Sequence, residues 1–430
     1  MKFMKELWKN LKRIIYHFNK FNQGDEVMNL NLEKIKRAQE NIKNVARRTP
    51  LFYSSTFAKE TGYNIYLKCE NKQKTGAFKI RGAYNKIASL TEDEKKRGVI
   101  ASSAGNHAQG VAYAATAFGI KSTVVMPDTA PQAKVKATKG YGAQVIQYGE
   151  VYDECYCKAI EVQRQTGATF IHPFNDEEVM AGQGTIGIEI LEDLPEVDAI
   201  IVPIGGGGLI SGVAVAAKTI KPSIKIIGVQ PSIIASSKAS FEQGKIVTLP
   251  GVKSLADGIS VKAPGDLAFE YIKNYVDDIV TVSEDDIAYG IFCLMERSKL
   301  VAEGAGAAAI AALLSNKVEI QGKNVVALIS GGNIDIAAVS KIIDRELIIL
   351  GRRIRFVVEL QDKVGQLGQL VTNVVSMGAN VVKVRQDNNW NEKGLDYANV
   401  LFEIEVQTRE HAQKVIDTLR EKGYNLEIVG

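Results

Sequence analysis

The sequence is poor in cysteine and histidine for its length, and this scarcity excludes several classes of protein. Its 430 residues include four cysteines and four histidines. The cysteines form no disulfide framework, and the pair Cys155 and Cys157 has neither a second pair nor a nearby histidine to complete a zinc site. We therefore expect reduced thiols, a cytoplasmic location and no bound metal.

The sequence also lacks dense blocks of basic residues and long uninterrupted apolar runs. The formal net charge is only +4, which argues against a nucleic acid as the main partner. Residues 199–217 carry no charge, but Pro203 and four consecutive glycines interrupt them. This pattern favours a buried strand, a turn and a buried helix, so we expect no membrane span.

The N-terminal stretch has no signal-peptide pattern. Residues 1–22 are rich in lysine and carry apolar side chains at roughly helical spacing, which would fit a helix on a membrane surface. They lack the continuous apolar core and small-residue cleavage site of a secretory signal. A loosely attached extension is the simpler interpretation, and we expect residues 1–27 to be poorly ordered.

What the sequence does have is a regular alternation of short apolar runs and helical patterns. Few hairpin signals interrupt it, so it predicts parallel sheets covered on both faces. So many strands would make one open sheet unusually large, and two α/β lobes with a cleft between them are the better prediction. The predicted strands are 65–69, 98–101, 122–126, 143–148, 169–173, 199–204, 225–230, 279–283 and 324–329. The helical patterns include 105–118, 152–166, 179–194 and 285–299.

The pattern changes near residue 345. From about 350 to 430 the order strand, helix, strand, strand, helix, strand fits in about 80 residues. This order predicts a separate C-terminal module with a ferredoxin-like βαββαβ fold.

Glycine is concentrated where a predicted strand gives way to a helix. The run Gly205–Gly208, followed by Leu209, exceeds what a tight turn needs, and backbone N–H groups at a helix N-terminus form an anion cradle. Ser211 stands where the third glycine of a dinucleotide motif would be, and no Walker motif occurs. The sequence therefore predicts a site for a single phosphate.

Two further polar loops follow predicted strands. The stretch ASSAGNHAQG at 101–110 offers hydroxyl, amide and backbone N–H groups that could hold a carboxylate, although an ordinary helix cap would look the same. The stretch ISGGN at 329–333 also ends a strand. Ligands bind beyond the carboxyl ends of parallel strands, so we expect these loops to face one site.

The segment TGAFKIRGAYNK at 75–86 supplies an amine. Its apolar face by helical spacing is Ile80, Ala83, Tyr84 and Ile87. Lys79 is off that face and is expected to point into the cleft, whereas Arg81 and Lys86 are interpreted as solvated or structural charges. Gly76 and Gly82 are interpreted as leaving room for a cofactor. A lysine, a phosphate cradle and a carboxylate nest together suit pyridoxal 5'-phosphate.

Four motifs in this order carry a specific resemblance. TGAFKIRGA, SAGNHAQG, VPIGGGGLISG and LISGGN resemble the pyridoxal-phosphate threonine dehydratases (threonine ammonia-lyases) of the type-II, tryptophan synthase β-like fold, over about residues 30–345. GQGTIGIEI and VAEGAGAAA are also similar. The tail, with DKVGQL, resembles an ACT regulatory domain, with Val364 in place of the usual proline. The resemblance implies a catalytic domain at 28–345, with a smaller lobe at about 80–175, and an ACT-like domain at 350–430.

The resemblance also implies roles for individual residues. Lys79 would bind the cofactor covalently and later take the Cα proton of the substrate, and burial would lower its pKa toward that task. Phe78 would lie near the ring, Asn106 would bond the ring hydroxyl, and Ser330 would face the ring nitrogen. The phosphate would be held by Gly205, Gly206, Gly207, Gly208 and Leu209. The substrate carboxylate would be held by Ser103, Ala104, Gly105, Asn106 and His107.

The implied reaction is conversion of L-threonine to 2-oxobutanoate and ammonia, with L-serine giving pyruvate. Serine racemase is the nearest alternative, but racemases of this type need a second serine where this chain has Ala104. By the same resemblance, such racemases would have a cation site built from acidic residues, and this chain has Gln230 and Ser236 at the corresponding positions. A catalytically dead ligand sensor is the third possibility. The ACT-like domain would bind isoleucine or valine or only join subunits, and a homo-oligomer, dimer or tetramer, is expected.

Overall fold

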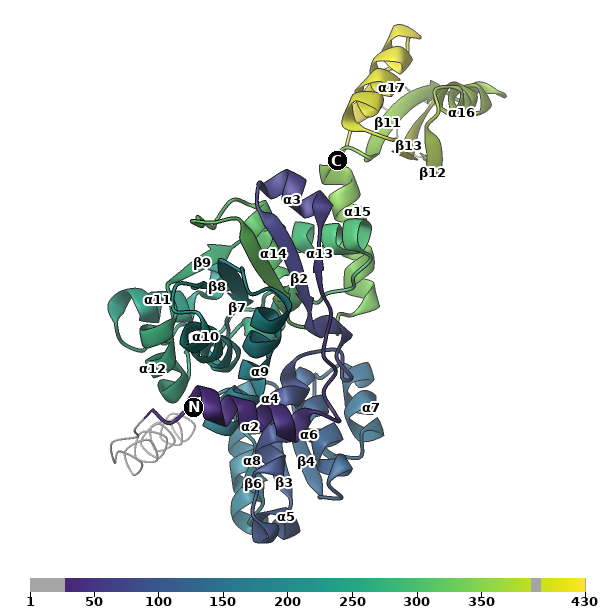
Figure 1. The fold of residues 1–430 in the computed structure, drawn as a ribbon. Helices are drawn as coiled ribbons and strands as arrows, with labels where there is room; N and C mark the ends of the chain where they lie inside the picture. The colour runs from purple at the N-terminus through teal and green to yellow at the C-terminus, as the bar shows by residue number, and fades with distance from the viewer. Residues whose placement is uncertain (1–27, 388–395, 430) are drawn as a thin grey trace. The chain divides into compact units, whose positions relative to one another are not determined.

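The chain folds into two compact units (Figure 1). The structure is a computed structural model that describes residues 28–387 and 396–429, so the extension expected at 1–27 lies outside the described residues. The first unit takes in the described residues up to Ile287 together with Val301–Asn333. The second takes in Ala288–Leu300 and the described residues from Ile334 onward.

The first unit is built on two sheets, and the larger has six strands in the order β1-β2-β10-β7-β8-β9. Every neighbouring pair is parallel except β1 with β2, which is antiparallel. The central strand β7 is buried along its whole length, because helices cover both faces of a parallel sheet. The strands are β1 (Leu51–Tyr53), β2 (Asn64–Cys69), β7 (Ala199–Pro203), β8 (Lys225–Pro231), β9 (Asp278–Val282) and β10 (Asn324–Ile329).

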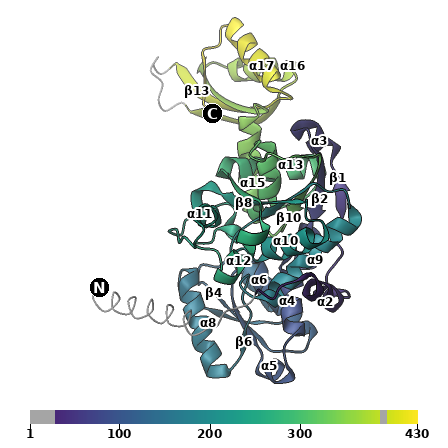
Figure 2. The ribbon, with the colours of Figure 1, turned by 60° about the vertical axis from the view of Figure 1, so that its left-hand side comes forward.

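The smaller sheet of the first unit has four strands in the order β5-β4-β3-β6, all parallel. It forms its own lobe, with β4 and β6 beside α5 and α8 (Figure 2). The strands are β3 (Val99–Ser102), β4 (Ser122–Met126), β5 (Gln144–Gln147) and β6 (Thr169–Phe170).

Helices cover the two sheets and pack closely on one another. A large apolar cluster lies between β7, α9 and α10, and the helices α9 and α10 approach so closely that a Cβ on Gly212 would lie 2.2 Å from the carbonyl oxygen of Met180. The helices that begin in this unit are α2 (Leu32–Ile42), α3 (Ser55–Thr61), α4 (Lys79–Ala88), α5 (Glu92–Arg97), α6 (Asn106–Ala117), α7 (Gln132–Gly140), α8 (Tyr152–Thr166), α9 (Glu177–Asp193), α10 (Gly208–Ile220), α11 (Ser236–Gln243), α12 (Asp266–Tyr275), α13 (Glu284–Ser298) and α14 (Gly304–Leu314).

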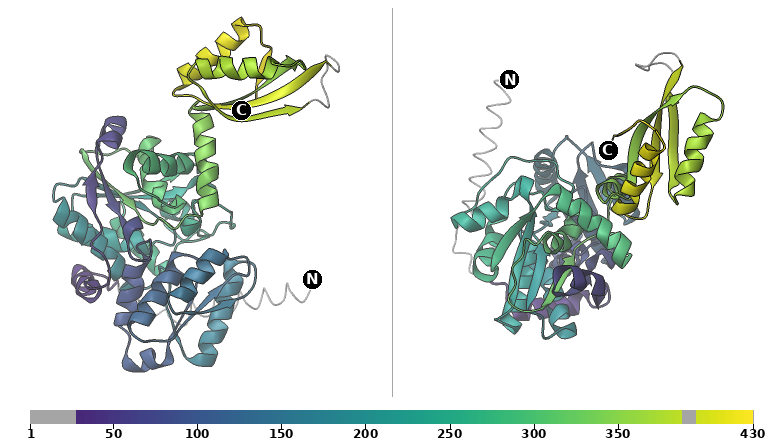
Figure 3. Two further views of the ribbon diagram at one scale, coloured as in Figure 1. Left: turned by 90° about the vertical axis from the view of Figure 1, so that its right-hand side faces the viewer. Right: turned by 90° about the horizontal axis from the view of Figure 1, so that it is seen from above.

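The second unit contains a four-stranded antiparallel sheet in the order β12-β13-β11-β14. Its two helices α16 and α17 lie on one face of the sheet (Figure 3), over a core in which the rings of Phe356 and Phe402 stack with centroids 5.5 Å apart. The elements are α15 (Ile336–Ile349), β11 (Arg353–Gln361), α16 (Gln366–Ser376), β12 (Asn380–Asp387), β13 (Tyr397–Glu405), α17 (Arg409–Glu421) and β14 (Leu426–Ile428).

The predicted fold class is confirmed. Each of the nine predicted strands is present, and 169–173 is shortened to the two residues of β6. The uncharged stretch 199–217 is strand β7, a glycine turn and helix α10, and no helix in the described part of the chain is long and apolar enough to cross a membrane. The sequence prediction missed β1, whose three residues pair antiparallel at the edge of the sheet and are too few to show alternation.

Candidate active site

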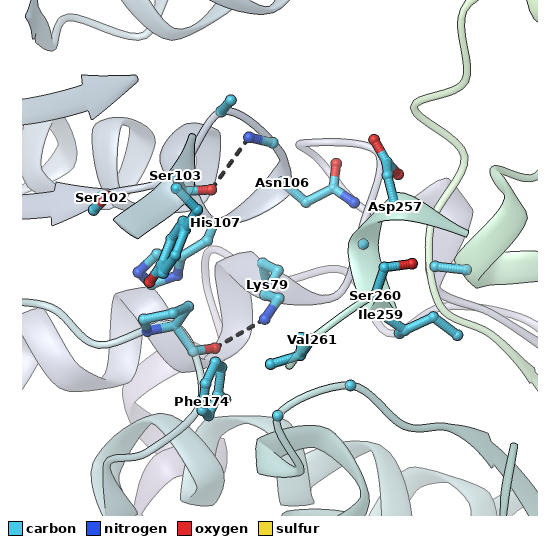
Figure 4. A pocket seen from close by; sticks show the side chains of 18 of the residues that line it. Lys79, Ser102, Ser103, Asn106, His107, Phe174, Asp257, Ile259, Ser260 and Val261 are labelled. Carbon is cyan, nitrogen blue, oxygen red and sulfur yellow. Dashed lines mark hydrogen bonds between the residues drawn. The ribbon is translucent and has the colours of Figure 1, made fainter. Parts of the chain in front are cut away.

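A cavity of about 620 Å³ lies in the first unit where β3, β7 and β10 end (Figure 4). Loops from both sheets line it, as expected for ligand sites beyond the carboxyl ends of parallel strands. The structure brings all of the predicted site residues to this cavity: Phe78, Lys79, Ser103, Ala104, Gly105, Asn106, His107, Gly205, Gly206, Gly207, Gly208, Leu209 and Ser330.

Lys79 is the first residue of α4 and points into the cavity (Figure 4). Its Nζ donates a hydrogen bond to the carbonyl oxygen of Pro173 at 2.8 Å and lies 5.1 Å from the centre of the Phe78 ring. Burial lowers the pKa of Lys79 to about 8, against an opposing effect of the Glu303 carboxylate. At pH 7 about a tenth of this amine is therefore neutral, far more than for an exposed lysine, and a nucleophile or base requires the neutral form.

The glycine run follows β7 and turns into α10. Gly207 has φ of 101°, which L side chains rarely adopt. A Cβ on Gly206 would lie 2.4 Å from the ring of Phe174, and one on Gly208 would lie 2.6 Å from the Phe174 carbonyl oxygen. These glycines let the loop pack against Phe174, and no side chain caps α10. The first N–H groups of α10 are thus available to an anion in the cavity.

Asn106 starts α6, and its side-chain amide is held from both ends. Its Nδ2 donates to Glu303 Oε1 at 2.6 Å, and its Oδ1 accepts from Asn333 Nδ2 at 2.8 Å. Asn333 is the last residue of the ISGGN stretch. Two polar loops that the sequence assigned to one site are therefore joined by a direct hydrogen bond.

Glu303 was not among the predicted site residues. It is buried at the N-terminal cap of α14, and burial together with the nearby Asp257 carboxylate raises its pKa to about 7. A signal for it was present in the sequence, because VAEGAGAAA places one acidic residue at the head of an otherwise apolar helix.

Two neutral histidines lie beside this cavity, His107 buried and His172 half-buried. The Nε2 of His107 lies 2.8 Å from the carbonyl oxygen of Ile171, and burial, helped by the nearby Lys79, lowers the pKa of His107 to about 3. Burial likewise lowers the pKa of His172 to about 4, and its Nδ1 accepts the N–H groups of Phe174 and Asn175. Both imidazoles therefore hold neighbouring loops in place and are not suited to exchange protons near pH 7.

Two serines at the head of α6, Ser102 and Ser103, line the cavity. Ser103 Oγ accepts the N–H of Gly105 at 3.2 Å (Figure 4), and Ser102 Oγ is buried without a partner in the described structure. Ala104 contributes only a methyl group. Ser330, after β10, is buried, and its carbonyl oxygen accepts the N–H of Phe78 at 3.1 Å, which ties the start of α4 to the strand end.

The interpretation of the two flanking glycines as space for a cofactor is wrong. Neither Gly76 nor Gly82 lines the cavity. A Cβ on Gly76 would lie 2.3 Å from Oδ1 of Asn333, and one on Gly82 would lie 2.6 Å from the carbonyl oxygen of Val179. Both glycines make room for protein atoms, so they serve packing.

Comparisons with known proteins agree on one family. A family model described as pyridoxal-phosphate dependent enzyme matches residues 42–331. An L-threonine ammonia-lyase of Thermotoga maritima is 51% identical over 401 residues, which cover 93% of this chain and all of the relative. The processed threonine deaminase isoform 2 of Solanum lycopersicum is 38% identical, with a TM-score of 0.71 and coverage of 75% of this chain and 89% of that one. A maize serine racemase is also 38% identical, with a TM-score of 0.70 and coverage of 74% and 98%.

Proposed function

The chain belongs to the pyridoxal-phosphate-dependent enzymes, and we propose that it is a threonine ammonia-lyase, which converts L-threonine to 2-oxobutanoate and ammonia. L-Serine would give pyruvate and ammonia by the same route. The observation that carries the proposal is Lys79, a buried amine of lowered pKa in a cavity that several helices face with uncapped N-termini.

The residues present fit pyridoxal phosphate. Four helices, α4, α6, α10 and α14, begin at the cavity with no side chain capping them, so their N–H groups can receive the two anions of a cofactor and its amino-acid substrate. We assign the phosphate to Gly205–Leu209 and the substrate carboxylate to Ser103–His107. Phe78 would lie beside the ring, Asn106 at its hydroxyl and Ser330 at its nitrogen.

The chemistry divides between the cofactor and the chain. When bound, pyridoxal phosphate withdraws electrons from the substrate Cα, which makes loss of the Cα proton and of the β-hydroxyl feasible. Lys79 would hold the cofactor, and its Nζ would accept the Cα proton of the substrate. The Asn106 amide donates one N–H to Glu303 and accepts a hydrogen bond from Asn333, so its second N–H would be available to orient the ring. The loop Ser103–His107 would hold the substrate carboxylate.

A lyase is favoured over a racemase by the cavity wall. A racemase needs a proton donor on the face opposite the lysine, and Ala104 cannot provide one. The two positions that correspond to a racemase cation site are engaged with protein atoms: Gln230 Oε1 accepts the N–H groups of Ser237 and Lys238, and Ser236 Oγ donates to the carbonyl oxygen of Val261. Efficient formation of D-serine from L-serine would overturn this choice.

For the second unit we propose a regulatory role. The βαββαβ fold supports an ACT-like domain at 350–430, next to a catalytic domain at 28–345 with a smaller lobe at about 80–175. The proposed effector is isoleucine or valine, and the proposed assembly is a dimer or a tetramer. Both proposals go with a role of the enzyme in isoleucine biosynthesis. No disulfide joins Cys69, Cys155, Cys157 or Cys293 in the described structure, which supports a cytoplasmic location. Turnover that does not change with any branched-chain amino acid would leave subunit assembly as the domain's role.

The decisive experiment is a 2-oxobutanoate assay on the purified holoenzyme with L-threonine, repeated with isoleucine and with the Lys79→Ala variant. We expect turnover by the wild type and none above background by the variant. A wild type without keto-acid product and without the visible absorbance of a lysine-bound cofactor would be a sensor rather than an enzyme.

A further inference from the structure

A buried ion cluster lies behind the helix that carries Lys79. Arg81 is fully buried and is the largest such side chain in the described structure. Its guanidinium donates six hydrogen bonds, which reach both carboxylate oxygens of Glu70, both of Glu189, and two other oxygens. The two others are Thr185 Oγ1 and the carbonyl oxygen of Arg47. Of the two interpretations that the sequence left open for Arg81, a solvated or a structural charge, the structure supports the structural one.

The cluster balances its charges. Lys68 Nζ donates to Glu189 Oε2 at 2.6 Å and to the carbonyl oxygen of Thr49 at 2.8 Å, so two cations face two carboxylates. Burial alone would lower the pKa of Arg81, but Glu70 and Glu189 raise it above its usual range. Burial alone would raise the pKa of Glu70, yet Arg81 holds it below its usual range. Arg81 and Glu70 therefore stay charged inside the protein.

Close backbone contacts fix the same helix. A Cβ on Gly182 of α9 would lie 2.5 Å from the carbonyl oxygen of Arg81, and one on Gly82 would lie 2.6 Å from the carbonyl oxygen of Val179. On the α6 side, a Cβ on Gly110 would lie 3.2 Å from the carbonyl carbon of Lys79. Helix α4 is thus in backbone contact with α9 and α6 at its first turn.

The spacing of Lys79 and Arg81 places them on different sides of α4. Two residues correspond to a rotation of about 200° about a helix axis. Lys79 therefore projects into the cavity while Arg81 projects into the cluster. Any rotation of α4 that moved the Lys79 amine would have to break bonds of Arg81.

We propose that Arg81 is a positioning residue: through Glu70 and Glu189 it fixes the rotation of α4 and thereby where the Lys79 amine stands in the cavity. The inference rests on the proposed function only in the identity of the substrate. Stability by itself accounts poorly for the cluster, since a buried ion network is often no more stable than apolar residues of the same volume. A planar guanidinium with six hydrogen bonds fixes the orientation of the helix that carries it, and an apolar side chain cannot do this.

The test is a charge-balanced variant, Arg81→Met with Glu70→Gln, which leaves the Lys68–Glu189 pair in place. Unfolding by urea reports stability. Borohydride reduction followed by peptide mapping reports how much cofactor is attached at Lys79, and the pH midpoint of the visible band of the lysine-bound cofactor reports the surroundings of its nitrogen. Neither of these two readouts depends on which amino acid the enzyme consumes.

We expect the variant to fold, to shift that pH midpoint, and to lose about tenfold to a hundredfold in kcat for threonine with little change in KM, since a misplacement of about 1 Å can cost that much. Arg81→Lys keeps the positive charge but loses the planar guanidinium, and we expect a smaller shift of the pH midpoint in the same direction. If Arg81→Met/Glu70→Gln does not fold, the same measurements on Arg81→Lys decide the matter.

Two matched controls separate positioning from loss of stability. Lys86→Met removes another α4 cation, which pairs with Asp176 at 2.7 Å, and Asp277→Asn weakens the ion pairs to Lys218 and Lys225 away from the cavity. Both should keep the wild-type pH midpoint and kcat. A stable Arg81 variant with wild-type midpoint, labelling and kcat would overturn the proposal. A wild type that carries cofactor on Lys79 but ignores threonine would contradict the proposed substrate and leave the proposal about Arg81 to be decided by the spectroscopic readouts.

Discussion

Two groups of polar side chains lie on opposite sides of α4, and their pKa values shift in opposite senses: one group is driven toward its neutral forms and the other is held in its charged forms. In the cavity, burial lowers the pKa of Lys79 to about 8 and of His107 to about 3, and raises that of Glu303 to about 7. In the cluster, the pKa of Arg81 is raised and that of Glu70 is lowered. The cavity groups are driven toward neutrality, whereas the cluster groups are held in their charged forms.

The difference lies in the partners and not in the depth of burial. The amine of Lys79 has one hydrogen bond, to a carbonyl oxygen, while the guanidinium of Arg81 has six, four of them to carboxylates. A buried group without an adequate counter-charge is costly for folding and chemically reactive, which marks a functional site. A buried group with all its donors satisfied marks a structural one.

The largest expected effect is on turnover. Lys79→Ala should reduce 2-oxobutanoate formation by about a thousandfold or more, because it removes both the cofactor attachment and the base. The cluster is untouched, so the far-ultraviolet circular dichroism spectrum should match the wild type. Residual activity within tenfold of the wild type would contradict the assignment of Lys79.

The next largest effect should come from breaking the cluster without compensation. Glu189→Gln leaves Arg81 and Lys68 facing a single carboxylate, and we expect a loss of about 3–5 kcal/mol in the free energy of unfolding. Urea denaturation measures it. Loss of less than about 1 kcal/mol would show that the cluster tolerates an unpaired charge and would remove the contrast with the cavity.

Replacing Lys79 should raise the free energy of unfolding, whereas Glu189→Gln should lower it. The folded pKa of Lys79 is below its unfolded value, so the unfolded chain binds more protons between pH 8 and 10.5 and stability rises with pH across that window. Lys79→Met should therefore stabilise the cofactor-free protein at pH 7 by up to about 3 kcal/mol. The gain should shrink from pH 8 upward and vanish above 10.5, as followed by urea denaturation at each pH. A pH-independent gain would mean that the amine is not forced toward neutrality.

Glu303 offers the mirror image with an effect of similar size, because its pKa is raised by about as much as that of Lys79 is lowered. Its folded pKa is raised, so the folded protein binds more protons between pH 4.5 and 7 and stability falls as pH rises through that window. Glu303→Gln should stabilise the cofactor-free protein above pH 7 by up to about 3 kcal/mol, with no difference below pH 4.5. Thermal unfolding at the two ends of the window measures the change, and equal shifts at both ends would refute it.

Much of the cavity could be predicted from the sequence, because its groups lie in local patterns. The glycine run after a buried strand, and Lys79 off the apolar face of its helix, are signals contained within a few residues. The cluster could not be predicted in the same way. Arg81 is 11 residues from Glu70 in the sequence and 108 residues from Glu189, so no local spacing pattern reveals these pairs. Helical spacing gave α4 one apolar face, whereas the structure buries it on several sides.

The cluster also links the chemistry of Lys79 to the completion of folding. Lys68, Glu70, Arg81 and Glu189 come from β2, the turn after it, α4 and α9, and none of their charges leaves water cheaply without the others. A growing chain that has made α4 but not α9 cannot dock that helix, and Lys79 remains a solvated lysine like any other. We therefore expect the lowered pKa of the Lys79 amine to arise only after α9 has docked, so that the chemistry of this lysine depends on residues from a distant part of the sequence.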